Sequence, residues 1–405
     1  YVMSAIEIIT RVHANSIEAW GESNPDALVL SGDLTTSCEI DGFRDKFPDR
    51  FLSMGLAEQN MMSFAAGLAR EGFIPHVHTF AVFMYRRALD QIEMSIAYPN
   101  LPVKLFGFLP GVTTPGGASH QAINDIAVIR SLPNFTILET GDATDVESVT
   151  QLANSINGPV YIRMVRGALP RLFPAADKIE LNRARVISTG EDIALFSTGI
   201  CTEEAMRAVE MLRICGVSIQ HLHVTTLKPF SDPQVISAIK GARFGTISME
   251  NHSINGGLGT CVAETIAEHG LETNFLRIAL NDTYLQGAST KFLIGRYGID
   301  ALALVTQVEK LIGKKLVTNQ TGPEGKVANR IYIEEATEIE KELYLGLVFD
   351  RSSESIMVVA STEGGMSVEE ISKEKPETII RSKIEVAVGM QSFQARELAF
   401  GLGIE

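Results

Sequence analysis

The sequence is poor in cysteine, in basic residues and in long apolar runs, and each shortage excludes a class of protein. Its four cysteines lie far apart without any Cys-x-x-Cys spacing, which argues against a disulfide framework or a zinc site and fits a reducing compartment. The formal net charge of −14 argues against non-specific nucleic-acid binding, which needs a basic surface. No apolar run reaches the roughly 18 residues of a membrane span, and no signal peptide is evident. We therefore expect a cytoplasmic protein that binds neither nucleic acid nor membranes.

What is present is an ordinary globular composition. Hydrophobic residues make up 45% and charged residues 21% of 405 residues, which is enough core for two or three domains of about 150 residues each. Apolar strand patterns alternate with helical patterns over most of the chain. This alternation predicts an α/β fold.

The predicted elements fall into three segments. In residues 1–170 we predict helices over 1–20, 59–70, 88–97 and 123–130, and strands over 27–31, 51–54, 74–79, 103–108 and 160–165. In residues 185–311 we predict strands over 193–198, 217–222 and 244–249, and helices over 202–215, 260–268 and 302–311. In residues 312–405 we predict strands over 330–334, 341–349 and 355–361, and a last helix over 392–402.

Glu58 stands where a short apolar strand ends and a helix begins, the usual mouth of an open α/β sheet. Taken alone, it is an acid that offsets the positive end of a helix dipole. However, Phe80 and Phe83 follow the next strand and are expected to form an apolar wall near the same edge. A carboxylate against such a wall keeps its proton more readily and can serve as general acid and base.

The motif Gly-Leu-Ala-Glu-Gln-Asn at residues 55–60, followed by Thr-Phe-Ala-Val-Phe at residues 79–83, resembles the pyrimidine-binding domain of transketolases. The resemblance implies that Glu58 bonds the aminopyrimidine ring of thiamine diphosphate and that Phe80 and Phe83 pack on this ring. It thereby implies a thiamine-diphosphate enzyme.

Two further residues are candidates for the same cofactor edge. Asp33 follows a predicted strand and could simply cap a turn or helix. Its Ser-Gly-Asp-Leu context resembles a Ser-Ala-Asp-Leu segment that lies close to the cofactor in transketolases. Arg87, one turn after Phe83, is the second candidate.

The resemblance also implies two residues that meet the substrate. Gly-Ala-Ser-His-Gln at residues 117–121 is similar to the Gly-Pro-Thr-His-Gln element of transketolases, which makes His120 a catalytic candidate; its alternative is a capping or core histidine. Arg166 ends a strand, where an arginine can clamp a phosphate or carboxylate or form a surface ion pair. It matches the transketolase arginine that binds the substrate phosphate.

Two positions depart from the transketolase pattern. Gly116 stands where typical transketolases have an aspartate that reads a sugar hydroxyl, and Phe108 replaces a histidine. These departures put the usual sugar-phosphate specificity in doubt.

Residues 185–311 resemble the carboxy-terminal domain of transketolases, which is mainly structural and helps to hold the dimer. The Gly-Gly-Leu-Gly cluster at residues 256–259 invites a phosphate-loop interpretation, but it lacks the lysine and the spacing of such a loop. We expect it to let a helix pack tightly on the sheet.

Residues 312–405 resemble an internal piece of the β subunit of succinyl-CoA or malate-CoA ligase, a partial ATP-grasp α+β segment. In that family the positions of Glu334, Thr337 and Glu342 border the adenine and ribose; the alternative is that they are solvated strand and loop residues. The upstream lysine and glycine-rich loop that hold ATP phosphates are missing, so we interpret the nucleotide site as vestigial. A fusion or a composite with an inactive ligase fragment is one interpretation.

The transketolase-like part also lacks something. Thiamine diphosphate needs a metal held by a Gly-Asp-Gly element, and the two Gly-Asp pairs, at residues 32–33 and 141–142, are not followed by glycine. We assign no metal ligand to this chain. The resemblance to split transketolases implies that a companion amino-terminal, diphosphate-binding subunit supplies Mg²⁺, in a homodimer or heterotetramer.

The sequence therefore predicts the carboxy-terminal subunit of a transketolase, which moves a two-carbon ketol unit from a ketose to an aldehyde and is active only with its companion. Three alternatives stay open. One is a deoxyxylulose-phosphate synthase, because Arg87 followed by Ala-Leu-Asp-Gln resembles a segment of that enzyme. The others are the β subunit of a 2-oxo-acid dehydrogenase, which shares the glutamate, and a non-catalytic assembly subunit.

Overall fold

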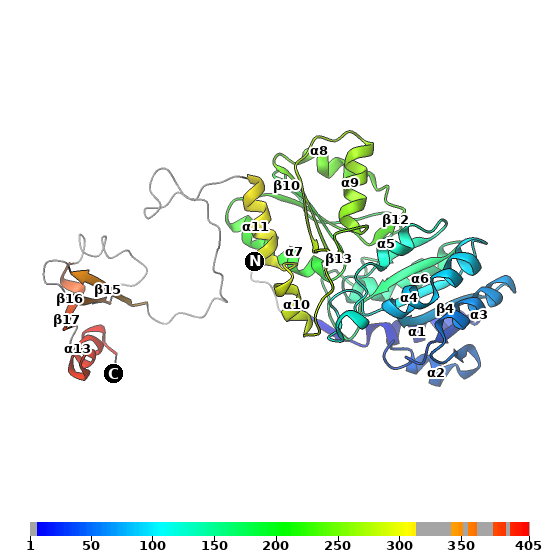
Figure 1. Cartoon of the computed structure of the whole chain (residues 1–405), viewed down its shortest axis with the longest axis horizontal. Coiled ribbons are helices and arrows are strands. Elements are labelled where there is room, and N and C mark those ends of the chain that lie inside the picture. Colours follow the sequence, from blue (N-terminus) through cyan, green and yellow to red (C-terminus); the bar gives the residue numbers. More distant parts are fainter. Residues whose placement is uncertain (1–5, 313–341, 351–354, 363–375, 386–388, 405) are drawn as a thin grey trace. The chain divides into compact units, whose positions relative to one another are not determined.

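The structure, a computed structural model, describes residues 6–312, 342–350, 355–362, 376–385 and 389–404. The chain divides into two compact units, residues 1–330 and 331–405 (Figure 1). None of the described helices is long and apolar enough to cross a membrane. All four cysteines are free thiols, and Cys215 alone among them is exposed.

The first unit contains a seven-stranded sheet with the order β12-β6-β7-β5-β4-β2-β3. Its strands are β2 (Ala27–Ser31), β3 (Phe51–Ser53), β4 (Ile74–Phe80), β5 (Lys104–Phe108), β6 (Thr136–Glu139), β7 (Val160–Met164) and β12 (Thr226–Lys228). All except β12 run parallel, so their carboxyl ends meet at one edge.

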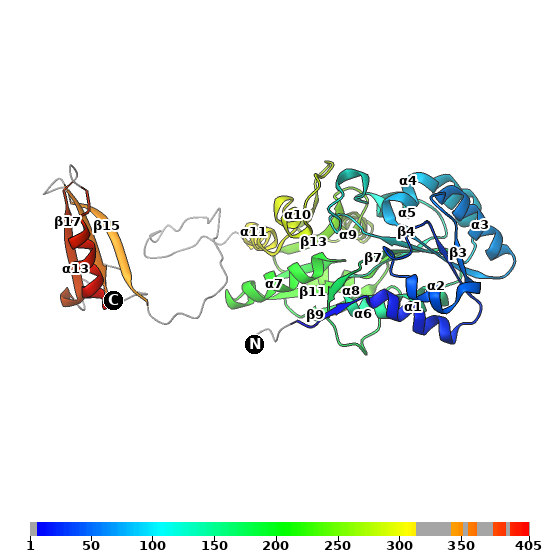
Figure 2. The same ribbon diagram turned by 90° about the horizontal axis from the view of Figure 1, so that it is seen from below.

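Helices cover both faces of this sheet. They are α1 (Val12–Ser23), α2 (Asp41–Lys46), α3 (Glu58–Arg70), α4 (Ala81–Gln91), which continues as a π-helix (Ile92–Ala97), α5 (Asp125–Arg130) and α6 (Ala143–Ser155). Figure 2 shows α4 and α5 on one side of the sheet and α1 and α6 on the other. The candidate residues Glu58 and Phe83 therefore belong to the face covered by α3 and α4.

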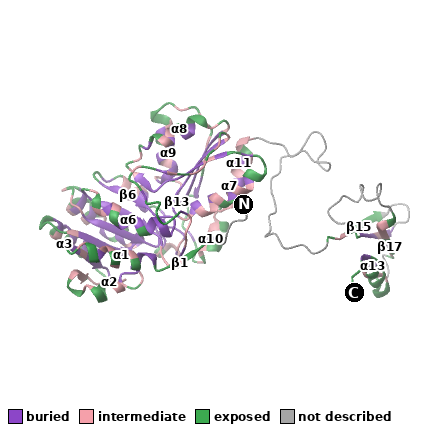
Figure 3. Ribbon diagram, turned by 180° about the vertical axis from the view of Figure 1, so that it is seen from behind, coloured by how far each residue is buried: buried purple, intermediate pink, exposed green. Residues whose placement is uncertain are grey.

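A second sheet of five strands follows in the order β14-β13-β10-β11-β9. Its elements are β9 (Arg185–Ser188), β10 (Ile193–Ser197), β11 (Ile219–His223), β13 (Gly245–Ser253), β14 (Phe275–Leu280), α7 (Cys201–Ile214), α8 (Pro233–Gly241), α9 (Leu258–Glu268), α10 (Thr290–Arg296) and α11 (Ala301–Ile312). The central strands of both sheets, such as β5, β7, β10 and β13, are buried throughout, whereas the edge strands β3 and β9 are partly exposed and the helices expose their outer faces (Figure 3). The predicted α/β class is thus confirmed.

Three element predictions in this unit differ from the structure in type or extent, and tertiary pairing explains two of the differences. Residues 1–20 were predicted as one helix, but β1 (Ile8–Thr10) pairs with β8 (Ala168–Pro170), and α1 begins only after Arg11, whose φ is +52°. The strand predicted over 244–249 continues to Ser253 because it pairs with β14. The helix predicted over 88–97 begins seven residues earlier, at Ala81.

The second unit is a three-stranded antiparallel sheet with one helix. Its elements are β15 (Tyr344–Asp350), β16 (Ser355–Ser361), β17 (Ile379–Ile384), α13 (Ser392–Leu402) and a short 3-10 helix (Pro376–Thr378). α13 packs Leu398 and Leu402 against Val358 and Ala360 of β16. The predicted strand over 355–361 and the last helix are confirmed, β17 was not predicted, and the strand predicted over 330–334 lies outside the described residues.

Three histidines are packed together beneath the first sheet. His13 of α1 meets His78 of β4 with 3.2 Å between their Nε2 atoms, and His76 stacks on Trp20 at 4.4 Å between ring centroids. All three are fully buried. Burial lowers the pKa of His76 and of His78 to about 3, because charging an imidazole away from water is costly.

This cluster predicts acid sensitivity. Each such histidine binds a proton in the unfolded chain below about pH 6.5 and in the folded chain only near pH 3, so stability present above pH 6.5 is lost as the pH falls. The expected loss is about 1.4 kcal/mol per pH unit for each histidine. Trp20, the single tryptophan, reports this region in denaturant unfolding followed by fluorescence between pH 8 and 5.

His76→Phe keeps the stack on Trp20 and removes one titrating group, so its free energy of unfolding should fall less steeply with acid. The control is His269→Gln, at an exposed histidine. Identical slopes for His76→Phe and the wild type would contradict the assignment.

Candidate active site

Glu58 is held at the carboxyl edge of the first sheet by a tight turn. Met54 donates its N–H to the carbonyl of Ser31, Gly55 turns the chain with φ +70°, and α3 begins at Glu58. Although it opens a helix, Glu58 is only 3% exposed. Its Oε1 accepts a hydrogen bond from Nη1 of Arg87 at 2.6 Å. A helix-end acid would normally be solvated, so this burial sets Glu58 apart.

The ion pair is one end of a continuous cluster of predicted site residues. The Arg87 guanidinium lies 3.8 Å from the ring centroid of Phe83. The Phe83 centroid in turn lies 5.6 Å from that of Phe80 and 5.4 Å from that of His120. We call these five residues the Glu58–His120 cluster. The sequence argument placed an apolar wall beside Glu58 but missed that Arg87 would pair directly with its carboxylate.

Gly107 explains why α4 brings two of these residues, Phe83 and Arg87, to the edge of the sheet. A Cβ on Gly107 of β5 would lie 3.1 Å from the Cα of Ala81 and 2.8 Å from Cε2 of Tyr161. Without that atom, the first residue of α4 packs directly on the sheet. The helix then carries Phe83 and Arg87 over the edge toward Glu58.

His120 ends the glycine-rich connection that follows β5. Its Nδ1 lies 2.9 Å from Oγ of Ser119, and a one-turn 3-10 helix (Gly117–Ser119) precedes it. A Cβ on Gly116 would lie 2.7 Å from Cβ and 2.8 Å from Cγ of His120. The position of His120 therefore requires a glycine at 116, where typical transketolases have an aspartate.

A fully buried arginine fixes the far end of this connection. Arg163 of β7 donates from Nε to Asp125 Oδ2 at 2.8 Å and from Nη1 to Glu139 Oε1 at 2.6 Å. Its Nη2 donates to the carbonyls of Ala122 and Asn251, each at 2.9 Å. Burial by itself lowers the pKa of Arg163, but the two carboxylates raise it above its ordinary value.

The second sheet closes over the same connection. Asn251 of β13 donates to the carbonyl of Pro110 at 3.1 Å and accepts from the N–H of Val112 at 3.0 Å. Gln121 donates from Nε2 to the carbonyl of Gln286 at 3.2 Å. The sequence interpretation missed Arg163 and Asn251. An arginine inside an otherwise apolar strand was the available signal, since such a charge must be paired.

The other predicted residues lie outside the Glu58–His120 cluster. Asp33 is exposed with φ +62°, next to Gly32, whose added Cβ would lie 3.3 Å from Thr79 Oγ1 at the end of β4. Arg166 lies near the thiol of Cys38. Its buried Nε has no hydrogen-bond partner among the described residues.

Phe108, which replaces a histidine, faces the opposite side of the sheet. It is buried against His13, at 5.3 Å between ring centroids, and is thus a core residue in this protein. In the second unit Glu342 is exposed, and Glu334 and Thr337 lie outside the described residues.

The glycine cluster after β13 does not form a phosphate loop. Glu250 occupies the amino end of α9 and accepts the N–H groups of Leu258 and Gly259 at 2.7 and 2.8 Å. A Cβ on Gly257 would lie 1.9 Å from Glu250 Oε2. The glycines let the helix pack on the strand, as predicted, and burial raises the pKa of Glu250 to about 7.

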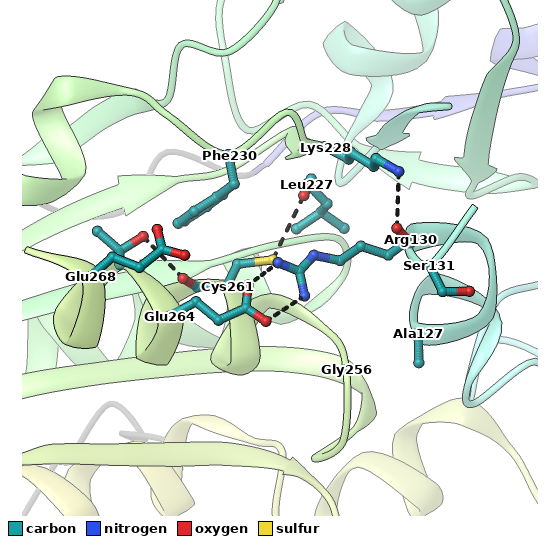
Figure 4. Close-up of a pocket in the computed structure, with 11 residues that line it drawn as sticks. Ala127, Arg130, Ser131, Leu227, Lys228, Phe230, Gly256, Cys261, Glu264 and Glu268 are labelled. Atoms are coloured by element: carbon teal, nitrogen blue, oxygen red, sulfur yellow. Dashed lines mark hydrogen bonds and ion pairs between the residues drawn. The ribbon is translucent and has the colours of Figure 1, made fainter. Parts of the chain in front are cut away.

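A cavity of about 450 Å³ lies between α5, β12 and α9 (Figure 4). Three of its charged groups already have protein partners: Arg130 pairs with Glu264, and Lys228 donates to the carbonyl of Arg130 at 2.9 Å. It contains no residue of the Glu58–His120 cluster. We therefore take the Glu58–His120 cluster, and not this cavity, as the candidate active site.

The cluster fits the aminopyrimidine end of thiamine diphosphate. One oxygen of Glu58, Oε2, has no hydrogen-bond partner in the part of the chain that the structure describes, and the neighbouring rings offer a flat apolar surface. No group of three or more histidine, cysteine, aspartate or glutamate residues within the described ranges could hold a metal ion. The Glu58–His120 cluster thus has the groups that an aminopyrimidine ring would contact.

Gly116→Ala tests the geometry of the cluster. The backbone of Gly116, with φ −70° and ψ 2°, accepts alanine, so the added Cβ acts only through its contact with His120. We expect His120 to move away from Phe83, seen as a changed histidine chemical shift in NMR spectra. Gly67→Ala, at an open helical position, is the control, and an unshifted His120 signal in Gly116→Ala would refute the placement.

Comparisons with known families agree with this architecture. Residues 9–171 match the family described as "Transketolase, pyrimidine binding domain", and residues 182–303 match "Transketolase, C-terminal domain". Residues 299–405 match "ATP-grasp domain". Both resemblances inferred from the sequence are confirmed by these matches.

Several relatives match about three quarters of the chain. A "Putative uncharacterized transketolase family protein" of Sinorhizobium fredii is 37% identical over 73% of this chain and 86% of its own length. The "6-deoxy-6-sulfo-D-fructose transketolase subunit" of a Clostridium species is 32% identical over 73% of this chain and 92% of its own length. A 1-deoxy-D-xylulose-5-phosphate synthase of Magnetococcus marinus is 30% identical over 75% of this chain, which spans only 49% of that enzyme.

A solved structure shares the fold. The chain titled "Split gene transketolase, inactive beta4 tetramer" is 35% identical, with a TM-score of 0.70, and the match covers 75% of this chain and 97% of that one.

Proposed function

This chain belongs to the transketolase family, and from that premise we propose that it is the carboxy-terminal subunit of a split, thiamine-diphosphate-dependent transketolase. In this proposal it transfers a two-carbon ketol unit from a ketose to an aldehyde, together with a companion subunit that binds the diphosphate and Mg²⁺. Two relatives are named as transketolase subunits, and the match to this chain covers 92% and 98% of their lengths. They support this division into two subunits.

The observation that carries the proposal is the Glu58–His120 cluster. Glu58 is buried with one oxygen fixed by Arg87 and the other free, so it can exchange a proton with a ring nitrogen placed against Phe80 and Phe83. Thiamine diphosphate held at this cluster would supply the nucleophilic carbon that the transfer requires. His120, at the rim of the same rings, holds or moves a proton at the substrate oxygen.

Two predicted residues have supporting roles in the proposal. Arg166 presents a buried Nε without a protein acceptor among the described residues, which suits an anionic group of the substrate. Asp33, exposed beside the end of β4, borders the cofactor edge.

The partner requirement is proposed from chemistry as well as from relatives. The Gly-Asp-Gly element is missing from the sequence, and the described residues offer no metal-binding group. The similar solved chain, titled an inactive tetramer of one subunit type, supports the idea that such a chain alone does not turn over. For the ATP-grasp-like unit we propose no catalytic part in this reaction.

Reconstitution tests the proposed function. The purified chain, thiamine diphosphate and Mg²⁺ are mixed with and without the companion subunit and screened against a panel of ketose donors and aldehyde acceptors. We expect ketol transfer only in the complete mixture, measured as product ketose by mass spectrometry. Robust transfer by the chain alone would refute the split-site proposal.

Glu58→Gln should leave folding intact and reduce kcat in the complete mixture by about 10²–10⁴, the range of general acid–base catalysis. Its matched control is Glu71→Gln, at an exposed glutamate just after α3. A near-normal kcat for Glu58→Gln would show that Glu58 has only a structural role.

A deoxyxylulose-phosphate synthase activity is the second candidate, supported by the relative that is 30% identical over 75% of this chain. The same screen separates the two, because this reaction releases carbon dioxide from a 2-oxo acid donor and ketol transfer does not.

A further inference from the structure

Arg86 of α4 binds the segment that carries His120. Its Nη1 donates to the carbonyl of Ala118 at 2.9 Å, and its Nη2 donates to the carbonyl of Gln121 at 3.4 Å. These two carbonyls lie on either side of His120 in the chain. One planar guanidinium thus bridges the backbone on either side of Ser119 and His120.

The third guanidinium nitrogen of Arg86 also has a protein partner. Its Nε donates to the hydroxyl of Tyr85 at 2.9 Å, and that hydroxyl in turn bonds the side chain of Asn124, the residue before α5. Tyr85 is only 3% exposed. The buried Tyr85 side chain therefore orients the guanidinium of Arg86. Because the guanidinium is planar and rigid, its two terminal nitrogens then meet the backbone carbonyls in a fixed direction.

The segment needs such an external support. Gly116 and Gly117 precede it, the latter with φ +69°, and glycine leaves the backbone many accessible conformations. Its own backbone bonds run from the N–H groups of His120 and Gln121 to the carbonyl of Gly117, at 2.9 and 3.0 Å, and Ser119 Oγ donates to the carbonyl of Gly116 at 3.3 Å.

Arg86 and Arg87 are consecutive and yet differ in what they hold. Arg87 lies over Phe83 and pairs with Glu58 inside the cluster. By contrast, Nε, Nη1 and Nη2 of Arg86 each donate to a protein acceptor. Its contacts suit a structural clamp.

We propose that Arg86 is a positioning residue that fixes His120 against Phe83 by clamping the carbonyls of Ala118 and Gln121 to α4. The clamp itself is a property of this chain, whereas its effect on turnover rests on the proposed function. In the reconstituted enzyme it keeps His120 within reach of the substrate oxygen, where a misplacement of about 1 Å can cost up to about 100-fold in rate.

The first test needs only the full-length chain. Arg86→Gln removes the fork, Arg86→Lys keeps the charge with a single donor group, and Tyr85→Phe removes the acceptor of Nε. Arg213→Gln, at an exposed arginine paired with Glu210 on α7, is the matched control. Hydrogen–deuterium exchange of the His120 and Gln121 amides is measured by NMR.

We expect exchange at these amides to rise at least about tenfold in Arg86→Gln, by less in Arg86→Lys and Tyr85→Phe, and not at all in Arg213→Gln. The amides of β4 serve as an internal reference and should not change. Unchanged exchange at His120 and Gln121 in all three variants would overturn the proposal. If Arg86→Gln fails to fold, the other two variants decide it.

The second test uses the complete mixture with the companion subunit. Arg86→Gln should lower kcat by about 10- to 100-fold with little change in KM for the ketose, and Arg86→Lys should restore part of the loss. Normal kcat in Arg86→Gln, in a mixture where Glu58→Gln lowers kcat as expected, would overturn the positioning role. If the wild-type mixture shows no ketol transfer, the proposed function fails, and the exchange measurement alone decides whether Arg86 is the clamp.

Discussion

A charged guanidinium in the middle of a buried parallel strand is the constraint on which the rest of this structure depends. Arg163 is fully buried and is stable there only if every donor finds an acceptor, since an unpaired charge away from water is very costly. Its acceptors come from α5, β6, the end of the glycine-rich connection and β13. These four segments, which include one strand from each sheet, are thereby all hydrogen-bonded to Arg163 of β7.

The candidate site is held in place by the hydrogen bonds of Arg163 and by α4. The connection that ends in His120 is held at its beginning by Asn251, through Pro110 and Val112, and just beyond its end by Arg163, through Ala122. From the other side, α4 sits directly on Gly107 and contributes ring contacts, the clamp of Arg86 and the ion pair of Arg87. A glycine-rich loop, which would be mobile in isolation, is therefore fixed between a helix and a neighbouring domain.

Much of this could be predicted from local patterns. The positions of β2 to β5 and β7, α3 and α13 were close to the predicted ones because apolar periodicity and flanking glycines report burial and chain reversal directly. Pairing partners were not predictable in this way. β1 needed β8, more than 150 residues away, and β12, which lies in the sequence among the strands of the second sheet, joins the first one beside β6.

The sequence by itself determined that an acid ends a strand at the sheet mouth, that two phenylalanines follow the next strand, and that a histidine ends a glycine-rich connection. It did not determine how they meet. Only the tertiary structure decided that Arg87 pairs with Glu58 while its neighbour Arg86 holds the backbone around His120, and that Gly116 must lack a Cβ. The physical reason is that periodicity encodes which face of an element is buried, whereas hydrogen-bond partners and steric limits arise only between segments that folding brings together.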